Sequence, residues 1–175
     1  PDEAVQGGSA DGNETVVFRA FGLDTSETYM VTYTINLYGV SSCNLTAACE
    51  PPTNLTNITC QTPVAWGDTC PAGEATAPLY KEGDSTAVFT TKSRAGLPFT
   101  FIATVKEQQG VEGSGAGGST ISLSGSGFDT LGQYRCRFTA QNGTQERFSS
   151  IITASTPTLL QCPTPGWGFT FPATE

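Results

Sequence analysis

The sequence predicts an all-β protein made of two tandem β-sandwich units, and three observations lead to this prediction. Residues 29–38, "YMVTYTINLY", alternate between apolar and polar side chains with the period of a half-buried strand. Short β-branched segments are separated by 20 Gly and 11 Pro residues, and no stretch has the periodicity of an amphipathic helix. In addition, the strand and turn of residues 20–33 recur at residues 125–138.

Two pairs of segments carry the duplication. "AFGLDTSETYMVTY" (20–33) aligns without a gap with "GSGFDTLGQYRCRF" (125–138), and "CQTPVAWGDTCPAGE" (60–74) aligns with "CPTPGWGFTFPATE" (162–175). A period of about 100 residues is too long for a solenoid repeat and matches the size of an immunoglobulin-like sandwich. The two predicted domains are residues 1–103 and 104–175.

Each strand has a predicted inward face. In the 29–38 strand this face carries Tyr29, Val31, Tyr33, Ile35 and Leu37. In its second copy it carries Tyr134, Cys136 and Phe138. Further strands are expected at residues 15–21, 85–91, 120–126 and 147–155.

The two copies differ in which strands they include. The second copy has no counterpart of residues 75–105, which read as two or three strands, and the first copy starts at the counterpart of Lys106. We therefore expect the first sandwich to lack a leading strand and the second to lack its closing strands. The missing strands would come from the rest of a longer chain or from a neighbouring molecule, because natural proteins avoid unpaired sheet edges.

Six cysteines occur without any histidine or Cys-x-x-Cys pair, which argues for disulfides and against a zinc site. The strand register places Cys136 inward, and a bridge to Cys162 would join two strands across the core. The first copy has Val31 where the second has Cys136. Its four cysteines allow three pairings. The two local pairs are slightly favoured, namely Cys43–Cys49 and Cys60–Cys70.

The chain carries five N-x-Ser/Thr sequons, which predict N-glycosylation and a secretory route to the cell surface or the extracellular space. Their asparagines are Asn13, Asn44, Asn54, Asn57 and Asn142.

The net charge of -8 argues against nucleic acid as a partner, because phosphates require clustered Lys and Arg. No apolar run in this segment is long enough to span a membrane.

Three further phrases carry a family resemblance. "GAGGSTISLSGSGF" (115–128), "YRCRF" (134–138) and "LLQCPTP" (159–165) resemble the IPT/TIG domain, an immunoglobulin-like fold of plexin-type receptors and fibrocystin-like surface proteins. The resemblance is good over residues 107–175 and weaker over residues 7–74, because Val31 departs from the cysteine pattern. It implies an extracellular module and no particular activity.

Catalytic chemistry has little support in the sequence. Without histidine there is no Ser-His-Asp or Cys-His arrangement, and the chain is not expected to be an enzyme. Asp24 and Asp129 recur at matched positions, where a turn cap is favoured over a calcium or glycan contact. The acidic run 9–14 lacks the spaced ligands of a calcium loop, so no cofactor other than N-linked glycans is expected. Trp66 and Trp167 are predicted to pack in the core or between domains.

These features predict a non-enzymatic structural module of a secreted, N-glycosylated repeat protein. Such a module would build a filament, stalk or surface coat through self-association or head-to-tail contacts between identical units. The alternative is a ligand-binding ectodomain of a receptor or adhesion protein. A third and weaker hypothesis is a carbohydrate-binding module that accompanies a catalytic domain.

Overall fold

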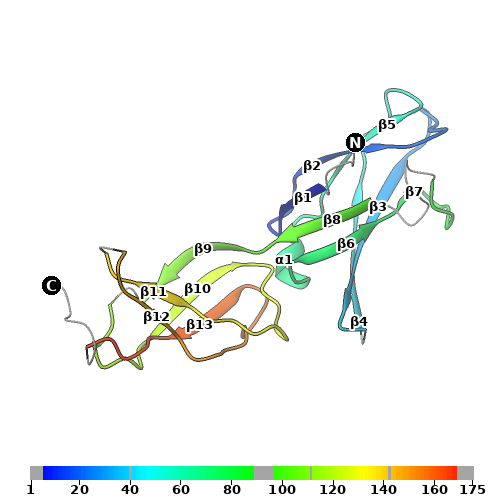
Figure 1. The fold of residues 1–175 in the computed structure, drawn as a ribbon. Helices are drawn as coiled ribbons and strands as arrows, with labels where there is room; N and C mark the ends of the chain where they lie inside the picture. Colours follow the sequence, from blue (N-terminus) through cyan, green and yellow to red (C-terminus); the bar gives the residue numbers. More distant parts are fainter. Residues whose placement is uncertain (1–5, 40, 89–96, 111, 142, 169–175) are drawn as a thin grey trace.

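The structure is a computed structural model that describes residues 6–39, 41–88, 97–110, 112–141 and 143–168. Within these ranges it has thirteen strands and one helix of four residues, so the prediction of an all-β fold is confirmed. The strands form two units placed end to end (Figure 1). We call β1 to β8, together with α1, the first unit, and β9 to β13 the second unit.

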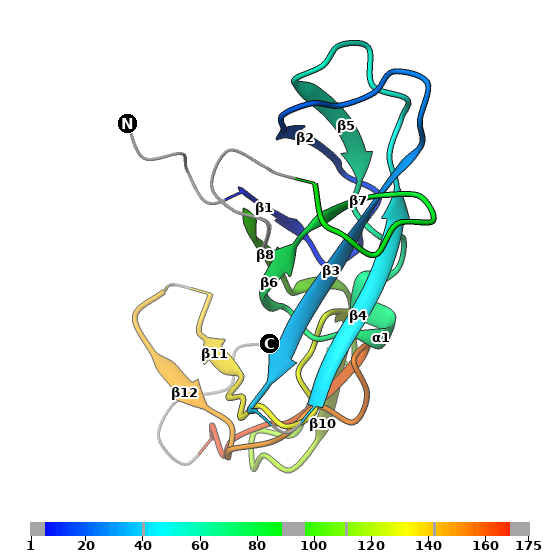
Figure 2. The same ribbon diagram turned by 90° about the vertical axis from the view of Figure 1, so that its right-hand side faces the viewer.

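The first unit is a sandwich of a large and a small sheet (Figure 2). The larger sheet has the order β1-β8-β6-β3-β4, with β7 also paired to β3, and only β1 and β8 run parallel. Its strands are β1 (Gln6–Ser9), β3 (Tyr29–Leu37), β4 (Ser41–Ala48), β6 (Gly73–Ala77), β7 (Leu79–Lys81) and β8 (Leu97–Ile102). The smaller sheet pairs β2 (Thr15–Arg19) with β5 (Asn57–Gln61).

The predicted inward face of β3 is confirmed, because its alternate residues from Tyr29 to Ile35 are buried and Leu37 packs at the edge of the core. Four aromatic rings fill the centre of this core. The ring of Trp66, on α1 (Trp66–Thr69), stacks on Phe101 with centroids 4.0 Å apart. The Tyr33 ring meets Phe99 and Phe101 edge-on at 5.5 Å each. The core role predicted for Trp66 is therefore confirmed.

The second unit contains a three-stranded sheet and a separate hairpin. The sheet has the order β13-β10-β9, and the hairpin joins β11 to β12. These strands are β9 (Thr104–Gln109), β10 (Thr120–Ser126), β11 (Arg137–Thr139), β12 (Glu146–Phe148) and β13 (Leu159–Pro163). Phe128, Ala154, Leu160 and Cys162 form a small second core.

Two expected strands differ from the structure. The strand expected over 147–155 ends at Phe148, because the Ser149 hydroxyl accepts the backbone N–H of Cys136 at 2.9 Å and interrupts the backbone ladder. The strand expected over 85–91 lies partly outside the described residues. Its described part forms one isolated bridge, between Ala87 and Tyr80.

The duplicated phrases form the same local structure. In the first unit Val16 lies opposite Cys60, and in the second Ile121 lies opposite Cys162, so the two strand pairs share one register. Each pair is followed by a threonine whose hydroxyl accepts the backbone N–H of the residue just before the neighbouring strand. These threonines are Thr62 and Thr164.

Three disulfides cross-link the strands. Cys136 bonds to Cys162, which is the pair expected from the sequence. The other bonds are Cys43–Cys70 and Cys49–Cys60, so the local pairs Cys43–Cys49 and Cys60–Cys70 are wrong. Cys43 lies within β4 and Cys49 directly follows it. Six residues of extended chain span about 20 Å, whereas disulfide Cα atoms lie less than about 7 Å apart.

Candidate functional site

The described sequon asparagines are all exposed, and Asn142 lies outside the described residues. Asn13 lies in the turn before β2 with a φ of 60°, a left-handed conformation that asparagine tolerates. Asn44 lies on β4, whose other face turns Cys43 and Leu45 toward the core. Asn54 and Asn57 lie in the loop before β5 and at its first residue. The geometry leaves all four side chains at the surface.

The sequon at Asn54 forms a tight turn. Its Oδ1 accepts the backbone N–H of Thr56 at 2.9 Å, the Thr56 hydroxyl at 3.0 Å and the backbone N–H of Asn57 at 2.8 Å. An asparagine whose side-chain oxygen accepts the backbone N–H of the residue two positions later is typical of turns. The carbonyl side of the amide is therefore fixed by the turn.

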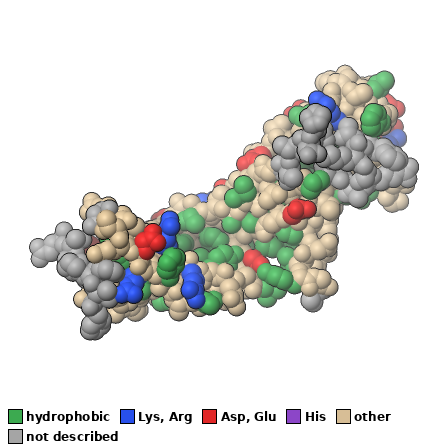
Figure 3. Space-filling model, in the orientation of Figure 1, with side chains coloured by type: hydrophobic (Ala, Val, Ile, Leu, Met, Phe, Trp, Pro, Cys, Tyr) green, Lys and Arg blue, Asp and Glu red, His purple; other side chains and the backbone are tan. Residues whose placement is uncertain are grey.

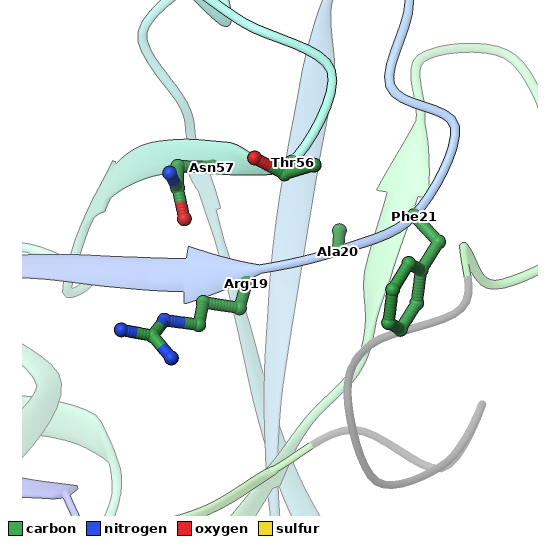
Figure 4. A pocket seen from close by; sticks show the side chains of 5 residues that line it. All are labelled: Arg19, Ala20, Phe21, Thr56 and Asn57. Carbon is green, nitrogen blue, oxygen red and sulfur yellow. The ribbon is translucent and has the colours of Figure 1, made fainter.

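A shallow pocket of about 300 Å³ lies beside Asn57, at the end of β2 (Figure 4). Arg19 and Phe21 extend to one side of their strand while Ala20 points to the other (Figure 4). Arg19 lies directly opposite Asn57 in the ladder, and the backbone N–H of Ala20 donates to Thr56. Phe21 is 61% exposed, so a large apolar ring stands in solvent at this end of the first unit.

A joint of backbone contacts connects the two units where α1 meets the end of β10. The N–H of Gly127 donates to the Gly67 carbonyl at 2.9 Å, and the N–H of Ala72 donates to the Gly127 carbonyl at 2.8 Å. A Cβ on Gly67 would lie 2.4 Å from the Gly127 nitrogen, and a Cβ on Gly127 would lie 2.6 Å from the Ala10 methyl. Both glycines are therefore required for the units to approach this closely.

Two polar contacts flank these glycines. Lys106 pairs with the Asp11 carboxylate at 2.8 Å, and the Thr104 hydroxyl donates to the same carboxylate at 3.2 Å. The pKa of Asp11 is lowered from 3.8 to about 2, mainly by the hydrogen bond from Lys106 and also by the hydroxyls of Ser126 and Thr104. On the other side the Tyr38 hydroxyl donates to the carboxylate of Asp129, which raises the pKa of Tyr38. Side chains from both units thus hold the joint.

Asp24 and Asp129 are turn caps, as the sequence predicts. Oδ1 of Asp24 accepts the backbone N–H of Ser26, and Oδ1 of Asp129 accepts the backbone N–H of Leu131. The two aspartates lie in different units and do not form one site. Trp167 is partly buried near Gly115, to which its backbone N–H donates.

The second unit leaves an apolar face accessible. A cavity of about 260 Å³ lies between its sheet and β11, and hydrophobic side chains gather over β9 and β10 (Figure 3). The apolar lining of this cavity comes from partly buried residues, with Cys162 at the base. These residues are Ile121, Leu123, Cys136 and Phe138, and the last three pack against the second core. In the first unit, β6 pairs with β3, the counterpart of β11, and β8 pairs with β6, so these two strands cover the side of the core that the second unit leaves accessible.

No group of three or more Cys, Asp, Glu or His side chains suited to hold a metal occurs among the described residues. In the acidic run 9–14, Asp11 pairs with Lys106 and the Glu14 carboxylate accepts the backbone N–H of Ser9. No helix in the described ranges is long and apolar enough to cross a membrane.

The joint is the feature that sequence reasoning missed. Gly67 and Gly127 belong to the duplicated segments, where they match Gly168 and Gly22. This recurrence was the available signal, since an aligned glycine in both copies indicates a shared backbone requirement or a close approach. Nothing in the sequence indicated that the two glycines meet each other.

No family model and no curated protein matches the chain. One similar solved structure is the full extracellular region of plexin A4, domains 1 to 10. It has a TM-score of 0.35 and 14% sequence identity, covering 93% of this chain and 12% of that one.

Proposed function

We propose that the chain is a non-enzymatic structural module of a secreted, N-glycosylated protein, and that it builds an extracellular filament, stalk or coat. In this proposal residues 1–103 and 104–175 are tandem IPT/TIG-like domains. The three disulfides support an oxidising compartment outside the cytosol. The four exposed sequons support glycans distributed over the surface of the first unit.

The observation that carries the proposal is the end-to-end joint. Backbone bonds through Gly67 and Gly127, an ion pair and a tyrosine contact set one orientation between the units. Flexible interdomain linkers instead use mobile Gly/Ser-rich segments with few contacts. A fixed orientation lets a series of such units extend in a regular direction, as a stalk or filament requires.

The accessible face of the second unit supports assembly as well. The strand edge of β11 and the apolar side chains beside it present the features that favour pairing with a further strand or hairpin. The first unit shows how such a face is covered, with Phe99 and Phe101 of β8 packed on Tyr33. We propose that corresponding strands, from a longer chain or a neighbour, close the second sandwich.

Two experiments on native material test this function. Negative-stain electron microscopy should show fibres or stalks with a regular axial repeat, and mass spectrometry after enzymatic deglycosylation should show modification of Asn13, Asn44, Asn54 and Asn57. Discrete particles that capture a soluble partner would favour the receptor alternative. Unmodified asparagines would remove the glycan coat from the proposal.

A further inference from the structure

We infer that a second copy of this chain docks its Gly22 end on the Gly168 end of the first, with the geometry of the internal joint. The Gly22 end consists of residues 20–24, and the Gly168 end consists of Gly115 with residues 167–168. This inference deepens the proposed function, on which it rests, by naming the surfaces and the partner. It follows from comparing the joint with the same positions at the two ends of the molecule.

The first step concerns Gly22, the counterpart of Gly127. Both glycines have a positive φ, 71° and 80°, and both precede a buried apolar residue and a capping aspartate. A Cβ on Gly127 would strike the first unit, whereas a Cβ on Gly22 would meet no described residue within 4 Å. The first unit thus presents the same turn that the second unit inserts into the joint, and no residue in the described ranges packs against its glycine.

The second step concerns Gly168, the counterpart of Gly67. Gly67 donates its N–H to the Ala10 carbonyl at 2.7 Å, and Gly168 donates its N–H to Gly115, the counterpart of Ala10, at 2.6 Å. Gly168 does not have the positive φ that favours glycine, and the three atoms nearest to a Cβ there would all belong to Gly115, at 3.3 to 3.6 Å. These contacts are far looser than the 2.4 Å that a Cβ on Gly67 would meet. The recurrence of glycine at 168 is explained if another backbone approaches it, as Gly127 approaches Gly67.

The third step concerns Phe21. Its counterpart in the second unit is Ser126, which is 1% exposed in the joint, whereas Phe21 is 61% exposed. A docked second copy would cover the Phe21 ring at the position where the first unit covers Ser126. Burying an exposed aromatic ring favours association, so Phe21 gives this contact an apolar anchor.

The two surfaces are different, so the contact is heterologous. Each copy that joins leaves one Gly22 end and one Gly168 end free, and a rotation that does not close a ring produces an open chain of copies. The chain would then associate in steps and not as a closed dimer.

Photo-crosslinking tests the contact directly. The glycosylated chain is produced with p-benzoylphenylalanine in place of Phe21, which keeps an aromatic side chain at this position. It is irradiated over a concentration series and analysed by peptide mass spectrometry. We expect intermolecular cross-links to Gly115 and residues 167–168 and a ladder of dimers, trimers and longer species. Cross-links from 21 to 21 would show an isologous dimer, and a monomer at every concentration would show no association. Either result overturns the inference.

A matched pair of variants gives an independent readout by sedimentation. Phe21→Asp should weaken association at least tenfold, while Phe148→Asp, at a residue 52% exposed on β12, should leave it unchanged. Equal effects of both variants would overturn the inference. Native fibres with glycosylated asparagines, but without the cross-link from residue 21 to Gly115 or residues 167–168, would leave the proposed function standing and remove only this contact.

Discussion

The phenolic oxygen of Tyr29 accepts a hydrogen bond from the backbone N–H of Asp24 at 2.8 Å. The same bond recurs in the second unit between Tyr134 and Asp129, at 2.6 Å. Tyr29 begins β3, and Tyr134 forms an isolated bridge with Ile152 shortly before β11. In each case the ring packs on the core and its hydroxyl closes the preceding turn. The bond therefore couples the turn conformation to the packing of the strand.

Removing this hydroxyl should destabilise each unit. In Tyr29→Phe the N–H of Asp24 loses its acceptor in a partly buried place, which costs about 1–3 kcal/mol. Tyr134→Phe should have a similar effect on the second unit. Thermal unfolding followed by circular dichroism would measure the loss. An unchanged melting temperature in both variants would show that water replaces the tyrosine oxygen without cost.

The opposite change is expected at Tyr33. Its side chain is completely buried, its hydroxyl has no hydrogen-bond partner within the described part of the chain, and burial raises its pKa. Tyr33→Phe keeps the ring contacts with Phe99 and Phe101 and removes an uncompensated polar group. We expect a gain of about 1 kcal/mol in the free energy of unfolding, measured by urea denaturation beside Tyr29→Phe. A loss of stability would reveal an unseen partner for the hydroxyl.

Gly127 and Gly22 form a matched pair for testing the joint. Alanine at either position bears the cost of a left-handed backbone, about 1–2 kcal/mol. Only Gly127→Ala also places a methyl 2.6 Å from the Ala10 Cβ, and overpacking costs about 1–3 kcal/mol more. Small-angle scattering at a concentration where the chain is monomeric should therefore show loosened units in Gly127→Ala and an unchanged maximum dimension in Gly22→Ala. Equal scattering curves would mean that the joint tolerates the methyl group.

Local periodicity and turn chemistry were readable from the sequence, whereas long-range pairing was not. The alternation in β3 identified its buried face because a strand has a side-chain period of two. The caps at Asp24 and Asp129 were readable because an aspartate bonds its own turn. The partners of Cys43 and Cys60 depend on which strands become neighbours, and the sequence carries no such information when several pairings are open. The contact between Gly67 and Gly127 depends in the same way on how the units meet.

The cysteine pairing can be checked without a structure. Under non-reducing conditions chymotrypsin separates the four cysteines of the first unit, cleaving after Leu45, Leu55 and Trp66. We expect one disulfide-linked peptide pair to contain Cys43 with Cys70, and another to contain Cys49 with Cys60. Serine in place of Cys43 and Cys70 should cost about 3 kcal/mol of stability, because the bond closes a loop of 27 residues. A peptide pair joining Cys43 to Cys49 would contradict the fold at β4.

The ion pair between Asp11 and Lys106 should make the joint sensitive to acid. The folded pKa of Asp11, about 2, lies below its ordinary value of 3.8. Its contribution is therefore fully present above about pH 4 and is lost as the pH falls toward 2. Because 40% of the Asp11 side chain is exposed, solvent screening leaves this contribution at about 1 kcal/mol or less.

Fluorescence energy transfer between dyes on the two units would follow this change during a titration from pH 5 to 2. The wild-type chain should loosen across the window, whereas Asp11→Asn should already be looser at pH 5 and change little. Lys81→Met removes the comparable ion pair with Glu27, far from the joint, and should titrate like the wild type. If Asp11→Asn kept the wild-type transition, the acid response would belong to other carboxylates, and the joint would depend on its remaining contacts, the backbone bonds of the two glycines and the bond from Tyr38 to Asp129.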